Sequence, residues 1–109
     1  MIRTSLLILL LALPAQAQTG WASYYGRELQ GHRTASGERF DYQALTAASR
    51  SLPFGTRLKV TNLKTRRSVV VRINDRGPFA RHRILDLSEA AARRIGLTGV
   101  GKVHIERLN

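Results

Sequence analysis

The 109-residue sequence contains no cysteine. It can therefore form no disulfide framework, no cysteine-ligated zinc site and no lipid-modified cysteine. Its three histidines, His32, His82 and His104, lack the spacing of metal ligands, so we predict neither a metal site nor a cofactor. Its serines stand in no nucleophile-elbow context, which argues against a serine hydrolase. Packing and hydrogen bonds must stabilise the fold.

Long hydrophobic runs are also absent. The longest, residues 6–13, is too short to span a bilayer. Arg3 precedes this run, and residues 15–17 follow it with the small-x-small pattern of a cleavage site. We expect residues 1–17 to be a signal peptide that is removed on export to the periplasm or the medium. Residues 18–109 should then form a single soluble domain without a stable membrane anchor, and we expect it to be a monomer.

Acidic residues are scarce, with 7 Asp and Glu against 18 Lys and Arg. Without Arg3 the chain keeps 17 basic residues, and 17 − 7 gives a formal charge of +10. Such a charge attracts polyanions. Nucleic acid is one candidate, but an exported protein meets the anionic polymers of the cell envelope instead, so we predict no nucleic-acid partner. The alternative that the charge serves only solubility and loose adhesion stays open.

Alternation of apolar and polar residues predicts several short strands and one helix. In the helix, Ser88 is the expected N-cap and Gly96 the expected stop. Two polar stretches are expected to be loops, residues 27–40 and 74–83. Many short strands with one small helix indicate a compact, mainly β barrel. The expected strands cover residues 20–26, 57–62, 68–73, 83–87 and 101–108, and the helix covers residues 89–95.

Five blocks of sequence point to a known family when they are taken in order. They read "GWASYYG", "TASGERFD", "LTAASRSLPFGTRLKVTN", "VVVRINDRGPF" and "RILDLSEAAARRIG". At these distances they resemble the rare lipoprotein A (RlpA) family, and the match covers residues 20–109. The resemblance implies a six-stranded double-psi β-barrel, related to the domains of barwin and expansins.

The resemblance also implies an activity. RlpA-like proteins include lytic transglycosylases, which cleave peptidoglycan between N-acetylmuramic acid and N-acetylglucosamine and prefer strands stripped of their peptides. The muramic acid's own hydroxyl closes on its anomeric carbon and leaves an anhydro end. No water is consumed, so one acid/base carboxylate can serve where glycoside hydrolysis uses two. The expected partner is the glycan strand, and no cofactor is implied.

Three acidic residues match the family's positions. Asp75 is expected to be the acid/base, Glu38 to assist it, and Asp86 to lie in the same groove. The loop that carries Glu38 would fold over both aspartates. Each residue also has a simpler interpretation: Asp75 stabilises a turn, Glu38 is an exposed loop charge, and Asp86 is a structural residue of the barrel rim.

Four further residues are possible members of the groove. One of Tyr24 and Tyr25 should lie in the core, while the other, taken as Tyr25, stacks on a sugar ring. Arg76 and Arg83 are candidates for holding a substrate carboxylate, although solvated arginines are commoner. Ser49 stands where family members that cleave glycans commonly have histidine. That serine favours the alternative function, a non-catalytic, expansin-like module that binds wall glycans without cutting them.

Overall fold

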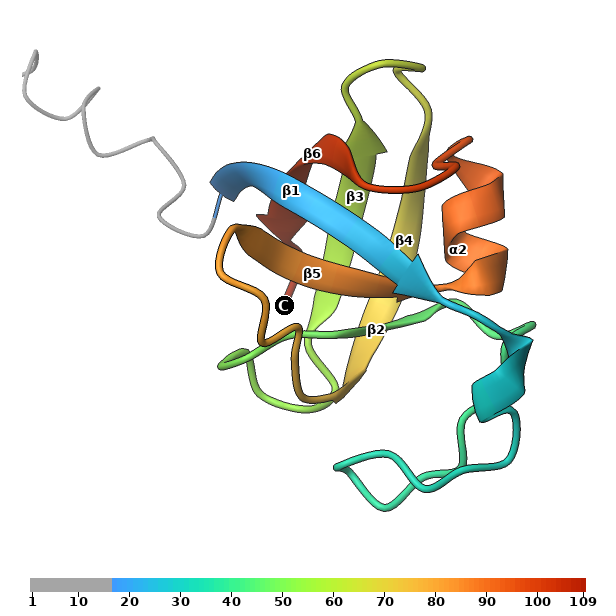
Figure 1. The fold of residues 1–109 in the computed structure, drawn as a ribbon. Helices are drawn as coiled ribbons and strands as arrows, with labels where there is room; N and C mark the ends of the chain where they lie inside the picture. Colours follow the sequence, from blue (N-terminus) through green and yellow to red (C-terminus); the bar gives the residue numbers. More distant parts are fainter. Residues whose placement is uncertain (1–16) are drawn as a thin grey trace, which may run out of the picture.

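The computed structural model describes residues 17–109, so all of the expected signal peptide except Ala17 lies outside the described residues. The described chain forms a closed barrel of six strands (Figure 1). The strands are β1 (Ala17–Tyr25), β2 (Thr46–Ala48), β3 (Arg57–Asn62), β4 (Ser68–Asp75), β5 (Arg83–Ser88) and β6 (Gly101–Arg107), and the helices are the 3₁₀ turn η1 (Arg27–Leu29) and α2 (Glu89–Arg94).

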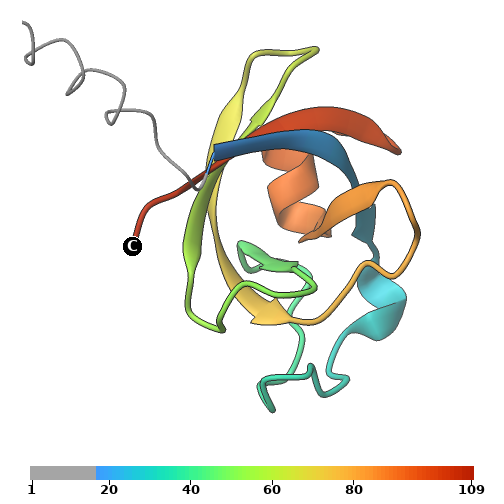
Figure 2. The ribbon, with the colours of Figure 1, turned by 90° about the vertical axis from the view of Figure 1, so that its left-hand side faces the viewer.

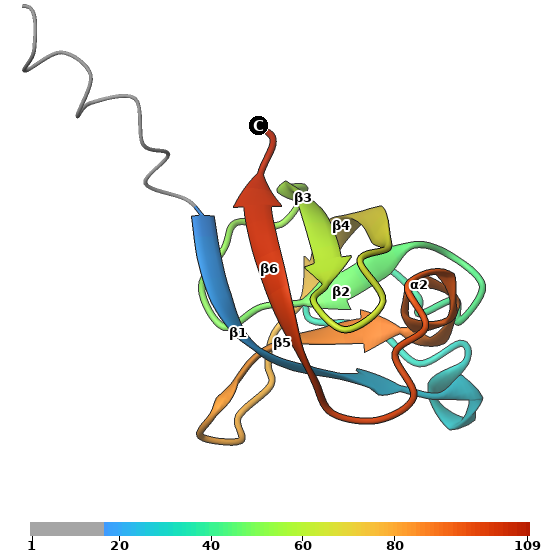
Figure 3. The same cartoon turned by 90° about the horizontal axis from the view of Figure 1, so that it is seen from above.

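The strand order around the barrel is β1-β5-β2-β4-β3-β6, and β6 closes onto β1. The pairs β1/β5 and β2/β4 are parallel, and the other four pairs are antiparallel. The strands appear as a ring in Figure 2, and Figure 3 shows β6 running beside β1 on one side and β3 on the other. This architecture confirms the predicted mainly β, six-stranded barrel.

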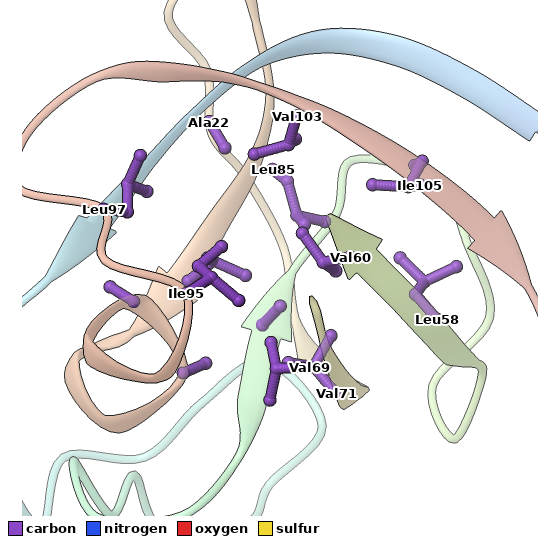
Figure 4. Packing of buried hydrophobic residues seen from close by; sticks show 14 of the residues in the cluster. Ala22, Leu58, Val60, Val69, Val71, Leu85, Ile95, Leu97, Val103 and Ile105 are labelled. Atoms are coloured by element: carbon purple, nitrogen blue, oxygen red, sulfur yellow. The ribbon is translucent and has the colours of Figure 1, made fainter. Parts of the chain in front are cut away.

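The core fills the inside of the barrel because apolar residues alternate along the strands. Leu58 and Val60 of β3, Leu85 of β5 and Val103 of β6 are fully buried (Figure 4). Leu87 of β5 is fully buried as well. The outward residues between these positions are left free to form surface sites.

Helix α2 packs against the strands β1, β4 and β5. Ser88 caps its N-terminus, as predicted, because its Oγ accepts a hydrogen bond from the Ala91 N–H at 3.3 Å. Gly96 follows the helix with φ of 68°, a conformation that glycine adopts without strain. No helix among residues 17–109 is long and apolar enough to cross a membrane.

One boundary differs from the prediction in a way that matters for the site. Asn74 and Asp75 end strand β4 and do not open the following loop. The strand continues because β2 pairs with it in parallel, with Ala48 opposite Asp75. The expected loop 27–40 also contains η1 and an isolated bridge between Arg33 and Arg39. Asp75 therefore projects from a hydrogen-bonded strand rather than from a loop.

Candidate functional site

The two aspartates lie on either side of the short strand β2. Ala48 is in register with Asp75 of β4 on one side and with Asp86 of β5 on the other. Their backbones are therefore two strand spacings apart, about 10 Å. The barrel brings together two carboxylates that are separated by a whole loop in the sequence.

Asp75 is held in one orientation by backbone N–H groups. Its Oδ1 accepts hydrogen bonds from the Ala35 N–H at 2.9 Å and the Arg76 N–H at 2.8 Å. The described residues place no hydrogen-bond donor on Oδ2. Asp75 is partly buried, so one oxygen is fixed by the protein while the other remains for a different partner.

Asp86 faces outward between two buried leucines, as its alternation predicts. The Ser23 hydroxyl donates a hydrogen bond to Asp86 Oδ1. Ser23 lies directly opposite Asp86 in the parallel β1/β5 register and is itself buried. The sequence analysis missed this partner, because the only signal for it is the register between strands that lie 63 residues apart.

Tyr25 lies beside both aspartates. Burial raises the pKa of its phenol well above the usual value, and the charges of Asp75 and Asp86 raise it further. Its ring packs on Phe40 with the centroids 4.8 Å apart. Its hydroxyl is buried, and no described residue forms a hydrogen bond with it. Tyr25 therefore stays neutral and offers an unused O–H group next to two carboxylates.

Glu38 has a different partner from the one expected. The loop that carries it does fold against the end of β4, since the Ser36 N–H donates to the Asn74 carbonyl at 3.3 Å. The Glu38 carboxylate, however, forms a bidentate pair with Arg72, with N–O distances of 2.9 and 2.7 Å. The hydrogen bonds from Arg72 lower the pKa of Glu38, so this carboxylate is ionised at neutral pH.

Ser49 adjoins the site through its backbone. Its N–H donates to the Asp75 carbonyl at 3.1 Å. Its buried Oγ points to the following turn and accepts from the N–H groups of Ser51, at 3.3 Å, and Leu52, at 3.1 Å. This serine thus stabilises a turn directly beside Asp75.

Neither candidate arginine directs its guanidinium to an aspartate carboxylate within residues 17–109. Arg76 Nη1 donates to the carbonyls of Ser49 at 3.1 Å and Leu52 at 2.9 Å. Its guanidinium lies 4.0 Å from the centroid of the Phe54 ring. Arg76 therefore braces the turn that Ser49 begins. Arg83 instead lines a hollow next to Tyr24, and its buried Nε has no partner among residues 17–109.

Two further observations concern metal binding and an exposed aromatic residue near Asp75 in the sequence. Within residues 17–109 no group of three or more His, Cys, Asp or Glu side chains is arranged to hold a metal ion. Phe79, four residues after Asp75, is 80% exposed on the loop between β4 and β5. The sequence analysis missed it, although an aromatic residue between a glycine–proline pair and basic residues was a usable signal.

This arrangement allows a single carboxyl group, that of Asp75, to donate and accept a proton. Asp75 has one oxygen fixed and one available, and it lies beside a neutral phenol and a second aspartate. Glu38 is already neutralised by Arg72 and suits orientation rather than proton transfer. The site is therefore suited to acid/base catalysis by Asp75.

Comparison with protein families gives one matching model, described as lytic transglycolase, over residues 17–107. A relative from Synechocystis, named probable endolytic peptidoglycan transglycosylase RlpA, is 62% identical over 89 residues. The match covers 80% of this chain and 28% of the relative. The chain thus spans less than a third of the length of that curated protein.

Solved structures share the fold at low sequence identity. The Streptomyces papain inhibitor has a TM-score of 0.69 at 21% identity, covering 88% of this chain and 97% of its own. A Clavibacter michiganensis expansin mutant in complex with cellohexaose has a TM-score of 0.66 at 22% identity, covering 85% of this chain and 50% of its own. These likenesses confirm the double-psi β-barrel.

Proposed function

Because the chain belongs to the lytic transglycolase family and is RlpA-like, we propose that it is an endolytic lytic transglycosylase of peptidoglycan, with Asp75 as its acid/base. The observation that carries this proposal is the Asp75 carboxylate, fixed through Oδ1 by two N–H groups and available at Oδ2. The name of the Synechocystis relative supports the same activity.

The proposed reaction needs one carboxyl group. Protonated Asp75 donates its proton to the glycosidic oxygen, and the bond from that oxygen to the anomeric carbon of N-acetylmuramic acid breaks. The C6 hydroxyl of the same sugar then bonds to the anomeric carbon and returns a proton to Asp75. The products are an anhydromuramic end and a free hydroxyl on N-acetylglucosamine. No water is consumed, so a second acid is unnecessary.

The neighbouring residues have supporting roles in this proposal. Neutral Tyr25 donates a hydrogen bond to the sugar, because its raised pKa keeps the phenol protonated and its hydroxyl has no partner among the described residues. Asp86, held by Ser23, orients hydroxyl groups of the substrate. Glu38 and Arg72 fix the loop whose Ala35 N–H donates to Asp75. We place the substrate among glycan strands stripped of their peptides, as the resemblance to the family implies.

We propose that the protein acts outside the cytoplasm, in the periplasm or the medium. The support is the sequence of residues 1–17, with its short apolar run and cleavage pattern. N-terminal sequencing of the protein recovered from the envelope or the medium tests this location. A start at Gln18 is expected, and an intact Met1 in the cytoplasmic fraction alone would refute it.

Ser49 supports the second candidate function, a non-catalytic glycan-binding module. Its hydroxyl is occupied by two backbone N–H groups and cannot carry a proton charge near neutral pH. Glu38, the other assisting group, is tied to Arg72. The expansin structure with cellohexaose is a double-psi barrel protein bound to a glycan, which is the behaviour that this alternative proposes.

The deciding experiment measures anhydromuramic ends by mass spectrometry. Purified protein is incubated with intact and with peptide-stripped glycan strands, beside the variants Asp75→Asn and Asp41→Asn. Asp41 is an exposed loop aspartate and serves as the matched control. We expect products from the native protein and from Asp41→Asn, and none from Asp75→Asn. If the native protein binds strands in a pull-down without forming any product, the binding module is the correct function.

The variant Ser49→His separates a weak enzyme from a binding module. A large gain in cleavage with unchanged binding shows that the native chain is a weakened transglycosylase. Unchanged cleavage in a folded variant removes Ser49 as the limiting feature. Thermal unfolding must accompany the assay, because histidine loses the two hydrogen bonds that Ser49 Oγ accepts.

A further inference from the structure

A second groove lies outside the Asp75 site. It runs between the turn that joins β3 to β4 and the segment that joins α2 to β6, both on the upper side of Figure 1. On the strand β1, Trp21 of this groove lies two residues before Ser23, the partner of Asp86. We call this second groove the Trp21 groove, and its lining residues are Trp21, residues 62–64 and residues 96–102.

Trp21 is the single tryptophan of the sequence. Its side chain is 43% exposed, although large aromatic side chains are usually buried in a barrel of this size. It lies opposite Lys102 in the β1/β6 register, and Lys102 Nζ is 5.7 Å from the centroid of its ring. Val100, also in the lining, is 58% exposed. The groove thus presents a half-open aromatic surface beside a cation.

The charge around the groove has one sign. Lys64 and Lys102 line it, and none of the lining residues is Asp or Glu. The guanidinium of Arg67 extends over Gly96, where an added Cβ would meet its Nη2 at 2.4 Å. Three cations therefore lie in or beside the groove, and Lys102 is next to the aromatic ring. This charge favours an anionic ligand.

The walls of the groove are fixed to one another. Asn62 Nδ2 and Thr65 Oγ1 both donate to the Ile95 carbonyl at 2.8 Å, which ties the β3–β4 turn to the end of α2. The Leu63 N–H donates to the Lys102 carbonyl at 3.1 Å. Glycine at position 99 leaves the floor open, since a Cβ there would meet nothing within 4 Å. A preformed groove loses little entropy when a ligand binds.

We propose that the Trp21 groove is a second, non-catalytic binding site for an acidic glycan. A sugar ring stacks on Trp21, and Lys64 and Lys102 neutralise carboxylates on the same strand. An aromatic face with flanking ammonium groups suits a sugar that carries carboxylates better than it suits a neutral sugar. The identification of this glycan as peptidoglycan rests on the proposed function. The two sites share no residue, so both can be occupied together.

The single tryptophan makes the test direct, because intrinsic fluorescence reports on this groove alone. The protein carrying Asp75→Asn, which prevents cleavage, is titrated with peptide-stripped glycan strands. We expect a saturable change in Trp21 fluorescence, and a response at least fivefold weaker to neutral chitin oligosaccharides of equal length. The double variant Lys64→Gln with Lys102→Gln should weaken the affinity at least fivefold. The control Lys59→Gln, on the outer face of β3, should leave it unchanged.

The outcomes separate this proposal from the proposed function. If the strands are cleaved or bound while Trp21 fluorescence does not respond, the second site is refuted and the transglycosylase stands. An equal response to anionic lipid vesicles, or an equal loss with Lys59→Gln, shows general attraction of polyanions and also refutes it. Trp21→Ala should bind strands more weakly yet cleave short soluble fragments normally. If Trp21→Ala does not fold, the lysine variants decide alone.

Discussion

At the scale of single residues, each carboxylate of the Asp75 site accepts hydrogen bonds from a different type of donor. Backbone N–H groups hold Asp75, a hydroxyl holds Asp86, and a guanidinium holds Glu38. Tyr25 is the exception, because its buried hydroxyl has no partner among the described residues. Groups that cost stability but remain in a site are expected to serve its function.

The first prediction follows from that hydroxyl. Tyr25→Phe removes a buried O–H that forms no hydrogen bond, so the free energy of unfolding should stay within about 0.5 kcal/mol of the native value or increase. Cleavage should fall by about tenfold, equivalent to about 1.4 kcal/mol, because a donor beside Asp75 is lost. Urea denaturation and the anhydromuramic assay measure the two effects. A clear loss of stability with unchanged cleavage would make Tyr25 a structural residue.

The second prediction concerns the pH dependence of the Glu38–Arg72 pair. The pKa of Glu38 is lowered from its ordinary 4.5 by the hydrogen bonds from Arg72, so the pair stabilises the fold above pH 4.5 and loses that effect as the pH falls through the lowered pKa. Both side chains are more than a third exposed, so the contribution should be below about 1 kcal/mol.

Urea denaturation at pH 7 and pH 3 tests this expectation. Glu38→Gln should reduce the free energy of unfolding at pH 7, and this effect should be smaller at pH 3, because the pair weakens as the pH falls toward the lowered pKa of Glu38. Glu28→Gln is the control, since Glu28 is exposed and is part of no ion pair among residues 17–109. An equal effect of Glu38→Gln at both pH values would show that the pair contributes nothing through its charge.

At the scale of elements, hydrogen bonds join both ends of helix α2 to the barrel. Ser88 Oγ accepts from the Ala91 N–H, donates to the Ala44 carbonyl at 2.6 Å and accepts from the Thr46 N–H at 3.4 Å. At the other end, the Ile95 carbonyl receives two side-chain donors from the β3–β4 turn. The hydrogen bonds of Ser88 hold β2 in position. Because β2 lies between Asp75 and Asp86, they also set the spacing of the two aspartates.

The third prediction tests the hydrogen bonds of Ser88. Ser88→Ala should lower the free energy of unfolding by about 2 kcal/mol, since it removes both the helix cap and the partner of a carbonyl next to β2. For a domain of this size, the loss corresponds to a drop in Tm of roughly 8–16 °C. Calorimetry measures it. Ser51→Ala, at an exposed position, should change stability by less than about 0.5 kcal/mol. Similar effects of the two variants would refute the role given to Ser88.

At the scale of the whole molecule, positive charge exceeds negative charge over most of the surface. The described residues contain 17 Lys and Arg and 7 Asp and Glu, and their ion pairs involve only Glu38 and Glu89. Most cations therefore face one another or solvent. Mutual repulsion destabilises the compact state while it attracts anionic polymers.

The fourth prediction follows from this repulsion. Raising NaCl from about 0.01 to about 0.15 M shortens the Debye length from about 30 to about 8 Å. The Tm should rise by a few degrees, while the affinity for anionic glycan falls. A Tm that falls on addition of salt would show that the few ion pairs outweigh the repulsion.

The sequence by itself determined five of the six strands, the helix and the family. Alternation predicted the strands over residues 57–62 and 101–108, and the Ser88 cap and the Gly96 stop were predicted from residue type alone. These features were predictable because side-chain direction in a strand and the capping of a helix depend on residues within one turn or two positions.

Only the tertiary structure decided which groups meet. Ala35 contacts Asp75 from 40 positions away, and Ser23 contacts Asp86 from 63. The pairing of Glu38 with Arg72, the unpartnered Tyr25 hydroxyl and the Trp21 groove likewise depend on the register around the closed barrel. That register is set by the packing of the whole core, because a shift of one residue would turn every side chain to the other face. Local sequence patterns carry no information about it.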